Sequence, residues 1–200
     1  MAAALNALYE AERVRIAALF GACDRENPVF GEGPMDARLM FIGEAPGGEE
    51  AKSGHPFVGT AGKTFSRLLE AAEIAREEVF ITNAVKFRPV HVKEKSVSNR
   101  TPKPDEVLAS LPLLRQELLI VRPHVVATLG NTPLCAVLKL AGQKAVTIGA
   151  VHGTRISLLL EGFSFVLFPL YHPASTIYNR ALTETLAADL TLLNALLKER

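Results

Sequence analysis

The sequence has few cysteines and no excess of charge of either sign. Its two cysteines, Cys23 and Cys135, are far apart and form no CxxC pair. A disulfide framework and a four-cysteine metal or iron–sulfur site are therefore not expected. The 22 basic and 21 acidic residues give a formal charge of +1. Any surface for a polyanion therefore has to be a local basic patch.

Long apolar runs are missing as well. No run approaches the length of a membrane span. The N-terminal stretch 1–23 carries Glu10, Arg13 and Arg15 among its apolar residues, which predicts an amphipathic helix and not a signal peptide. The sequence shows no internal repeat or low-complexity linker, and 48% of it is hydrophobic. We expect one globular domain spanning residues 1–200, located in the cytoplasm.

Short β-rich apolar runs alternate with helical stretches. The predicted strands are 37–43, 78–84, 124–130 and 163–172. Continuous apolar runs are typical of strands covered on both faces by helices. The alternation therefore predicts an α/β fold, a three-layer α-β-α sandwich with a central, mainly parallel four-stranded sheet. Residues 146–160 are expected to add a minor hairpin or an edge strand.

The helical stretches lie between and after these strands. The predicted helices are 60–73, 101–122, 131–142 and the tail 181–200. Thr101 or Asp105 is expected to cap the second helix and Asn131 the third. Pro112 is expected to kink or split the second.

Polar and glycine-rich motifs follow every predicted strand. They are GEAPG, TNAVKFRP, LGN and YHPAS, in chain order. Ligands of parallel α/β sheets bind beyond the carboxyl ends of the strands. Four separate segments therefore converge on one rim, where we expect a functional site.

The segment GTAGKT, residues 59–64, ends like a nucleotide-binding loop. That loop requires GxxxxGK[ST], and the position of its first glycine holds Phe57. A nucleoside triphosphate site is therefore not expected.

Taken singly, the residues of this rim have ordinary structural explanations. Phe57 fits a core ring, Asn83 a turn residue and His172 a polar residue at a strand end. Glu44 fits less well, because a lone carboxylate directly after a buried strand is uncommon unless it is used or paired. The presence of all four residues at one rim favours a functional site over four separate structural roles.

The ordered motifs resemble those of a known enzyme family. GEAPG, SGHPFVGTAGK, FITNAVKFRP, NRTPKPDE, PHVVATLG and YHPA, from about Phe41 to Pro173, are similar to the uracil-DNA glycosylase superfamily, most closely its family 4 branch. The resemblance implies a monomeric enzyme that flips uracil out of DNA and hydrolyses its N-glycosidic bond, leaving an abasic site, without metal or cofactor. Its partner would be DNA containing uracil or another deaminated base.

The resemblance implies a base pocket made by three residues. Phe57 would stack on the flipped base. Asn83 would bind its edge, because an amide donates to one acceptor and accepts from a ring N–H, which separates uracil from cytosine. Ala45 stands where relatives with a GQDPYH motif carry a water-orienting aspartate.

Three further residues are the catalytic candidates. His172 would donate a hydrogen bond to the departing base anion. Glu44 and Glu50 would substitute for the missing aspartate, Glu44 by shaping the pocket and Glu50 by supporting the water or the sugar cation.

Contacts with the DNA backbone are expected at the same rim. The candidates are the amides around Gly47 and Gly59, with Lys86, Arg88 and Ser175. Thr176 or Ile177 would be the wedge that fills the gap left by the flipped base. The segment VHVKEKSVSNR is interpreted as a solvated charged loop.

The sequence departs from family 4 in its cysteines. Family 4 proteins usually hold a [4Fe–4S] cluster with four of them, but Phe87 stands at the third position and only Cys23 lies in the N-terminal region. Four thiolates cannot be assembled, so the cluster is not expected. Two alternatives stay open: a glycosylase for another base such as hypoxanthine, and a protein that binds damaged DNA without cutting it.

Overall fold

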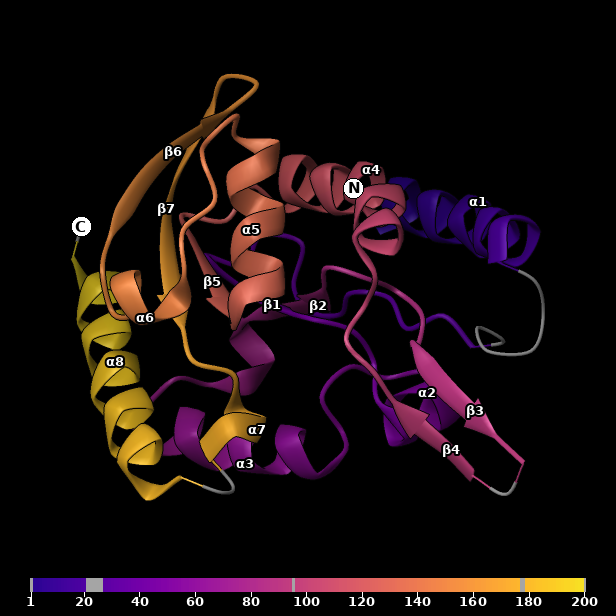
Figure 1. Ribbon diagram of the computed structural model, residues 1–200. Helices are drawn as coiled ribbons and strands as arrows, with labels where there is room; N and C mark the ends of the chain where they lie inside the picture. The colour runs from indigo at the N-terminus through magenta and orange to yellow at the C-terminus, as the bar shows by residue number, and fades with distance from the viewer. Residues whose placement is uncertain (1, 21–26, 95, 177–178, 200) are drawn as a thin grey trace.

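Five strands form one sheet with helices on both faces (Figure 1). The computed structural model describes residues 2–20, 27–94, 96–176 and 179–199. The strand order is β2 (Phe80–Asn83), β1 (Leu39–Gly43), β5 (Val125–Leu129), β7 (Phe163–Leu170) and β6 (Ile156–Leu160). The first four are parallel and β6 is antiparallel to β7. The mainly parallel sheet is confirmed, and the predicted count of four is corrected to five because β6 adds the expected edge strand.

Side chains of β1 alternate between two apolar layers. Met40 and Ile42 pack in the layer with α1 (Ala2–Phe20), α4 (Pro104–Val121) and α5 (Asn131–Leu140). Leu39 and Phe41 pack in the layer with α3 (Thr60–Ala71) and α8 (Arg180–Lys198). Two-sided burial explains why the strands read as unbroken apolar runs. The three-layer sandwich is confirmed.

The helices occur where they were predicted, with corrected ends. Lys103 precedes α4, and its N–H donates to the Glu106 carboxylate, so neither Thr101 nor Asp105 is the cap. Gly130 precedes α5, and the Asn131 side chain accepts from the Ile148 N–H instead. Glu106 is the third residue of α4, and a carboxylate at this position can satisfy the free N–H of the residue before the helix.

Pro112 does not split α4, which continues as one helix from Pro104 to Val121. Proline leaves the carbonyl of residue i−4, here Leu108, without its donor. Leu108 and Pro112 are both exposed, so water can hydrogen-bond to this carbonyl. The expected split is therefore wrong, whereas the expected kink stays a prediction.

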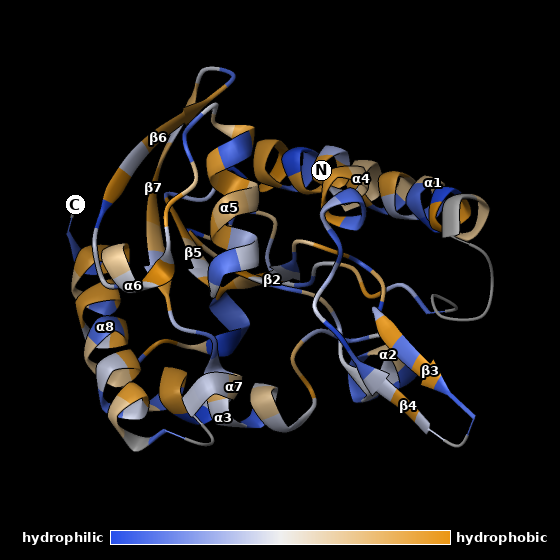
Figure 2. Ribbon diagram, in the orientation of Figure 1, coloured by the Kyte–Doolittle hydropathy of each residue, from blue (hydrophilic) through white to orange (hydrophobic). Residues whose placement is uncertain are grey.

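The segment predicted as a loop is a β-hairpin of β3 (Val90–Lys93) and β4 (Ser96–Asn99). Val92 and Val97 face each other across it, and both are exposed. Valines alternate with polar residues along both strands, which is the two-residue period of a strand. Figure 2 shows this alternation as orange and blue bands on β3.

Four short helices complete the described chain. They are α2 (Gly48–Ser53), η1 (Arg76–Glu78), α6 (Ile148–Val151) and α7 (Pro173–Thr176). The predicted N-terminal helix is α1, which buries Leu5, Tyr9, Glu12 and Ile16 along one side. None of the described helices combines the length and the apolar character needed to cross a membrane.

Candidate active site

Two of the three predicted base-binding residues, Phe57 and Asn83, meet at the carboxyl end of β1, where Gly43 is the last residue, whereas Ala45 packs against the apolar cluster of Ile16, Val85 and Phe87. A Cβ atom on Gly43 would lie 2.3 Å from Oδ1 of Asn83 and 2.6 Å from Cζ of Phe57. Real Cβ atoms essentially never come so close, so a side chain at position 43 would require Asn83 and Phe57 to shift. Asn83 and Phe57, 26 residues apart by their numbers, thus converge on one glycine.

The Phe57 ring lies between the core and the rim. Its centroid is 5.3 Å from that of Phe65 in the core and 6.4 Å from that of His172, with 29° between the planes of Phe57 and His172. Phe57 is 7% exposed. The ring is therefore part of the core and at the same time lies close to Asn83 and His172.

The backbone of Phe57 has a left-handed conformation with φ of 56°, which is uncommon for a bulky residue. Two neighbours hold it. Arg76 of η1 donates to the carbonyl oxygens of Pro56 at 3.0 Å and Phe57 at 3.1 Å. Gly62 packs so closely that a Cβ atom would lie 2.1 Å from the Phe57 oxygen. Sequence reasoning missed Arg76, which lies 19 residues from Phe57.

His172 follows β7 and presents a defined tautomer. The N–H of Ala174 donates to Nδ1 of His172 at 3.0 Å. Nδ1 is therefore an acceptor, and the proton of the neutral ring is on Nε2. Burial lowers the pKa of His172 below its ordinary value of 6.5. At neutral pH the side chain is thus an uncharged N–H donor.

Glu44, directly after β1, is half-buried and held by a second element. The Thr132 hydroxyl, in the first turn of α5, donates to Oε2 of Glu44 at 2.6 Å. The carboxylate therefore has a fixed orientation next to the loop after β5. Sequence reasoning missed Thr132, although it follows the LGN motif directly.

Glu50 of α2 joins two glycine loops. Its Oε2 accepts from the Gly47 N–H at 3.1 Å and its Oε1 from the Gly59 N–H at 2.8 Å. Both N–H groups already donate to Glu50. The prediction that they contact DNA phosphates is therefore wrong. The carboxylate orders the loops before and after α2.

Two of the predicted DNA contacts are turned inward. Lys86 is 0% exposed and forms an ion pair of 2.6 Å with Glu117, so it cannot reach a phosphate. Thr176 is buried and its hydroxyl donates to the Pro173 carbonyl at 2.7 Å, so it is not an exposed wedge. The other wedge candidate, Ile177, lies outside the described residues.

The remaining candidates stay at the rim. Ser175 is exposed, and its hydroxyl donates to the His172 carbonyl at 2.6 Å. Arg88 is half-buried, lies close to Gly48 of α2, and donates through Nε to Asn99 of the hairpin at 2.7 Å.

An iron–sulfur cluster does not fit this chain. Phe87, at the position of the third cysteine ligand, is buried in an apolar cluster with Ile16 and Val85, and Ala45 packs against the same cluster. Within the described ranges, no group of three or more His, Cys, Asp or Glu residues could hold a metal ion. Apolar packing occupies the position where the family would place a thiolate.

The family model of the uracil DNA glycosylase superfamily matches residues 30–197. The chain belongs to this superfamily. It is 42% identical over 166 residues to a type-4 uracil-DNA glycosylase of Saccharolobus solfataricus, covering 82% of this chain and 74% of the relative. A type-4 uracil-DNA glycosylase of Thermotoga maritima is 40% identical over 79% of this chain and 76% of its own length.

A type-5 uracil-DNA glycosylase of Pyrobaculum aerophilum is more distant, at 32% identity over 80% of this chain and 73% of the relative. The superfamily predicted from the motifs is confirmed, and so is the likeness to its type-4 members.

Proposed function

We propose that this protein is a uracil-DNA glycosylase that flips uracil out of DNA, hydrolyses its N-glycosidic bond and leaves an abasic site. One observation carries the proposal: the Asn83 amide and the Phe57 ring converge on the bare backbone of Gly43, with the His172 ring 6.4 Å from that of Phe57. Type-4 relatives at up to 42% identity support the same activity.

Asn83 and Phe57 supply base recognition in this proposal. The ring of Phe57 stacks on the flipped base. Oδ1 of Asn83 accepts from the N3–H of uracil and Nδ2 donates to O4. Cytosine has an acceptor at N3 and a donor at C4, so both contacts would be repulsive with cytosine.

His172 and Glu44 stabilise the two charges that form during cleavage. The bond between C1′ and the base nitrogen breaks, and its electron pair leaves with the base. Nε2–H of His172 donates to the base oxygen on which the negative charge gathers. The Glu44 carboxylate faces the sugar cation, orients the water that adds to C1′ and accepts the proton that this water loses. The released base anion takes up a proton from solvent. Both oxygens of Glu50 already accept loop N–H groups, so we assign Glu50 to loop ordering.

The rim supplies the contacts with the DNA backbone. Ser175 and Arg88 are the proposed phosphate contacts. The exposed Ser175 hydroxyl would exchange its bond to the His172 carbonyl for one to the phosphate. Both follow a strand of the sheet, β7 and β2 respectively, and the flipped nucleotide enters between these segments.

A base-release assay tests the proposal. Single-stranded and duplex oligonucleotides carrying one uracil are incubated with the protein and then treated with alkali. We expect cleavage at uracil that is lost in His172→Ala and Asn83→Asp and kept in His124→Ala, an exposed histidine just before β5.

The other outcomes separate the alternatives. Cleavage at hypoxanthine but not at uracil would identify a glycosylase for another deaminated base. Binding of uracil-containing DNA without release of either base would identify a binding protein.

A further inference from the structure

A lysine and a glutamate form a fully buried ion pair directly beneath the base-reading asparagine. Nζ of Lys86 lies 2.6 Å from Oε2 of Glu117, a residue of α4, and both side chains are 0% exposed. Nζ also donates to Oγ1 of Thr82 at 2.7 Å and to the backbone oxygen of Asn83 at 2.5 Å. All three N–H bonds of the ammonium group are thus used. Burial lowers the pKa of Lys86, and the Glu117 carboxylate opposes this effect.

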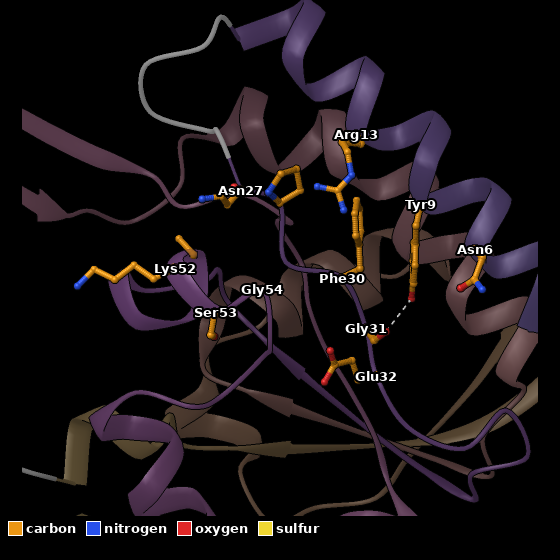
Figure 3. Close-up of a pocket in the computed structure, with 12 residues that line it drawn as sticks. Asn6, Tyr9, Arg13, Asn27, Phe30, Gly31, Glu32, Lys52, Ser53 and Gly54 are labelled. Atoms are coloured by element: carbon orange, nitrogen blue, oxygen red, sulfur yellow. Dashed lines mark hydrogen bonds between the residues drawn. The ribbon is translucent and has the colours of Figure 1, made fainter.

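The glutamate connects this pair to the N-terminal helix. The Tyr9 hydroxyl of α1 donates to Oε1 of Glu117 at 2.9 Å and lies 3.3 Å from the carbonyl oxygen of Gly31. Figure 3 shows Tyr9 reaching from α1 to Gly31 at the edge of a surface pocket. Burial and the Glu117 charge raise the pKa of Tyr9 well above its usual range, so it stays a hydroxyl donor.

The position of Asn83 explains why a donor is needed there. Among the described residues, β2 is an edge strand of the sheet and pairs with β1 alone. On its outer side a bridge pairs Glu32 with Ile81, two residues before Asn83. The Asn83 carbonyl lies beyond that bridge, at the strand end, and Lys86 supplies its hydrogen bond.

Stability alone does not account for such a pair. Desolvating two charges costs several kcal/mol per ion, and well-packed apolar residues of similar size are often equally stabilising or more so. The pair contacts the backbone of the residue that reads the base, which suggests a role in placing it.

We propose that Lys86 and Glu117 are positioning residues for base recognition. The ammonium group fixes the Asn83 carbonyl, and thereby the direction in which the Asn83 amide meets the flipped base. Glu117 holds the ammonium group in place and is itself held by Tyr9 and Thr82. This inference rests on the proposed glycosylase function and assigns to it residues that do not touch the base.

The variant that tests the pair removes both charges together. Lys86→Met alone would leave Glu117 buried without a partner, which is strongly destabilising. Lys86→Met with Glu117→Leu avoids this cost. Lys86→Met with Glu117→Gln is a second neutral pair that keeps an acceptor for Tyr9, and it provides the same comparison if the first pair does not fold.

A double-mutant cycle with Asn83→Ala separates positioning from general destabilisation. We expect the neutral pair to slow single-turnover uracil release roughly 10- to 100-fold when Asn83 is present, as misplaced active-site groups do. In the Asn83→Ala background the same pair should slow it less than about 3-fold, because residues that act through one another are not additive. If the neutral pair slowed uracil release by the same factor with Asn83 and with Asn83→Ala, the proposal would be overturned.

A control and a second readout complete the test. Leu193→Ala, on the buried face of α8, lowers stability away from Asn83. It should slow uracil release by the same factor with Asn83 and with Asn83→Ala. In NMR spectra, the side-chain amide signals of Asn83 should shift or broaden in the neutral pair and not in Leu193→Ala. Unchanged amide signals would also overturn the proposal.

The side-chain amide signals of Asn83 can be measured without catalysis. They therefore test whether Lys86 positions Asn83 even if the wild-type protein releases no uracil. Absence of uracil release by the wild type would contradict the proposed function alone.

Discussion

The hydroxyl of Thr132 donates a hydrogen bond of 2.6 Å to Oε2 of Glu44. This bond connects the residue after β1 to the first turn of α5, two segments 88 residues apart. It orients the Glu44 carboxylate, which we propose stabilises the sugar cation and orients the water. The effect of Glu44 on catalysis should therefore depend on Thr132.

Thr132→Val replaces the hydroxyl by a methyl group of the same shape. Without this bond the Glu44 carboxylate loses its fixed direction, so we expect single-turnover uracil release to fall at least about 10-fold. A hydrogen bond to a charged group contributes about 1.5–3 kcal/mol to stability, so the free energy of unfolding should fall by no more than this amount. Thr191→Val, on the exposed side of α8, is the matched control. Equal rates for the two variants would show that Glu44 needs no support from Thr132.

Glu50→Gln tests the connection between the glycine loops. The variant leaves one carbonyl oxygen for the N–H groups of Gly47 and Gly59, and an NH₂ group faces the other. We expect the free energy of unfolding to fall by about 1.5–3 kcal/mol, measured by chemical denaturation. Glu49→Gln is the control, since Glu49 is exposed and its carboxylate pairs with Lys52. Lost turnover at unchanged stability would instead place Glu50 at the reacting atoms.

The fold was predictable because burial on both faces leaves its signature in consecutive residues. The run 163–172 contains β7, Phe163–Leu170, and the run 37–43 contains β1, Leu39–Gly43. The hairpin 90–99 was not recognised, because its valines stand among charged residues and the stretch is short. The local sequence pattern of such a stretch favours a loop. The two strands form because they pair with each other, which the local pattern does not show.

The candidate site was predictable in part, for a related reason. Glu44 directly follows β1, Asn83 ends β2 and His172 lies two residues after β7, so topology alone brings them to one rim. The inward position of Lys86 was not predictable, because its partner Glu117 is 31 residues away and on another element. Thr132 was missed for the same reason, since its bond to Glu44 spans two distant segments.

Gly62→Ala tests the left-handed backbone of Phe57. The added methyl group would meet the Phe57 carbonyl, so the loop has to move and the ring with it. We expect the free energy of unfolding to fall by about 1–3 kcal/mol, as with other overpacked sites, together with a loss of uracil release. Gly149→Ala is the control, because its Cβ atom would have an ordinary contact of 3.7 Å with Tyr171. Full activity of Gly62→Ala would show that the position of Phe57 does not limit base stacking.

The His172 tautomer gives a prediction in the absence of DNA. Because Nδ1 accepts from the Ala174 N–H, nitrogen-detected NMR should find the proton of the neutral ring on Nε2. The pKa of His172 should lie below its ordinary value of 6.5. A proton on Nδ1, or a pKa above that value, would contradict both the geometry and the donor role.

The lowered pKa also predicts a pH dependence of stability. When the folded pKa lies below the unfolded one, the unfolded state binds more protons between the two values. Folding is therefore unaffected by His172 above about pH 6.5 and is progressively weakened as the pH falls below it. His172→Gln removes this component, so its free energy of unfolding should fall less than that of the wild type between about pH 7.5 and 5.5. Parallel losses in the two proteins would mean that other groups carry the acid sensitivity.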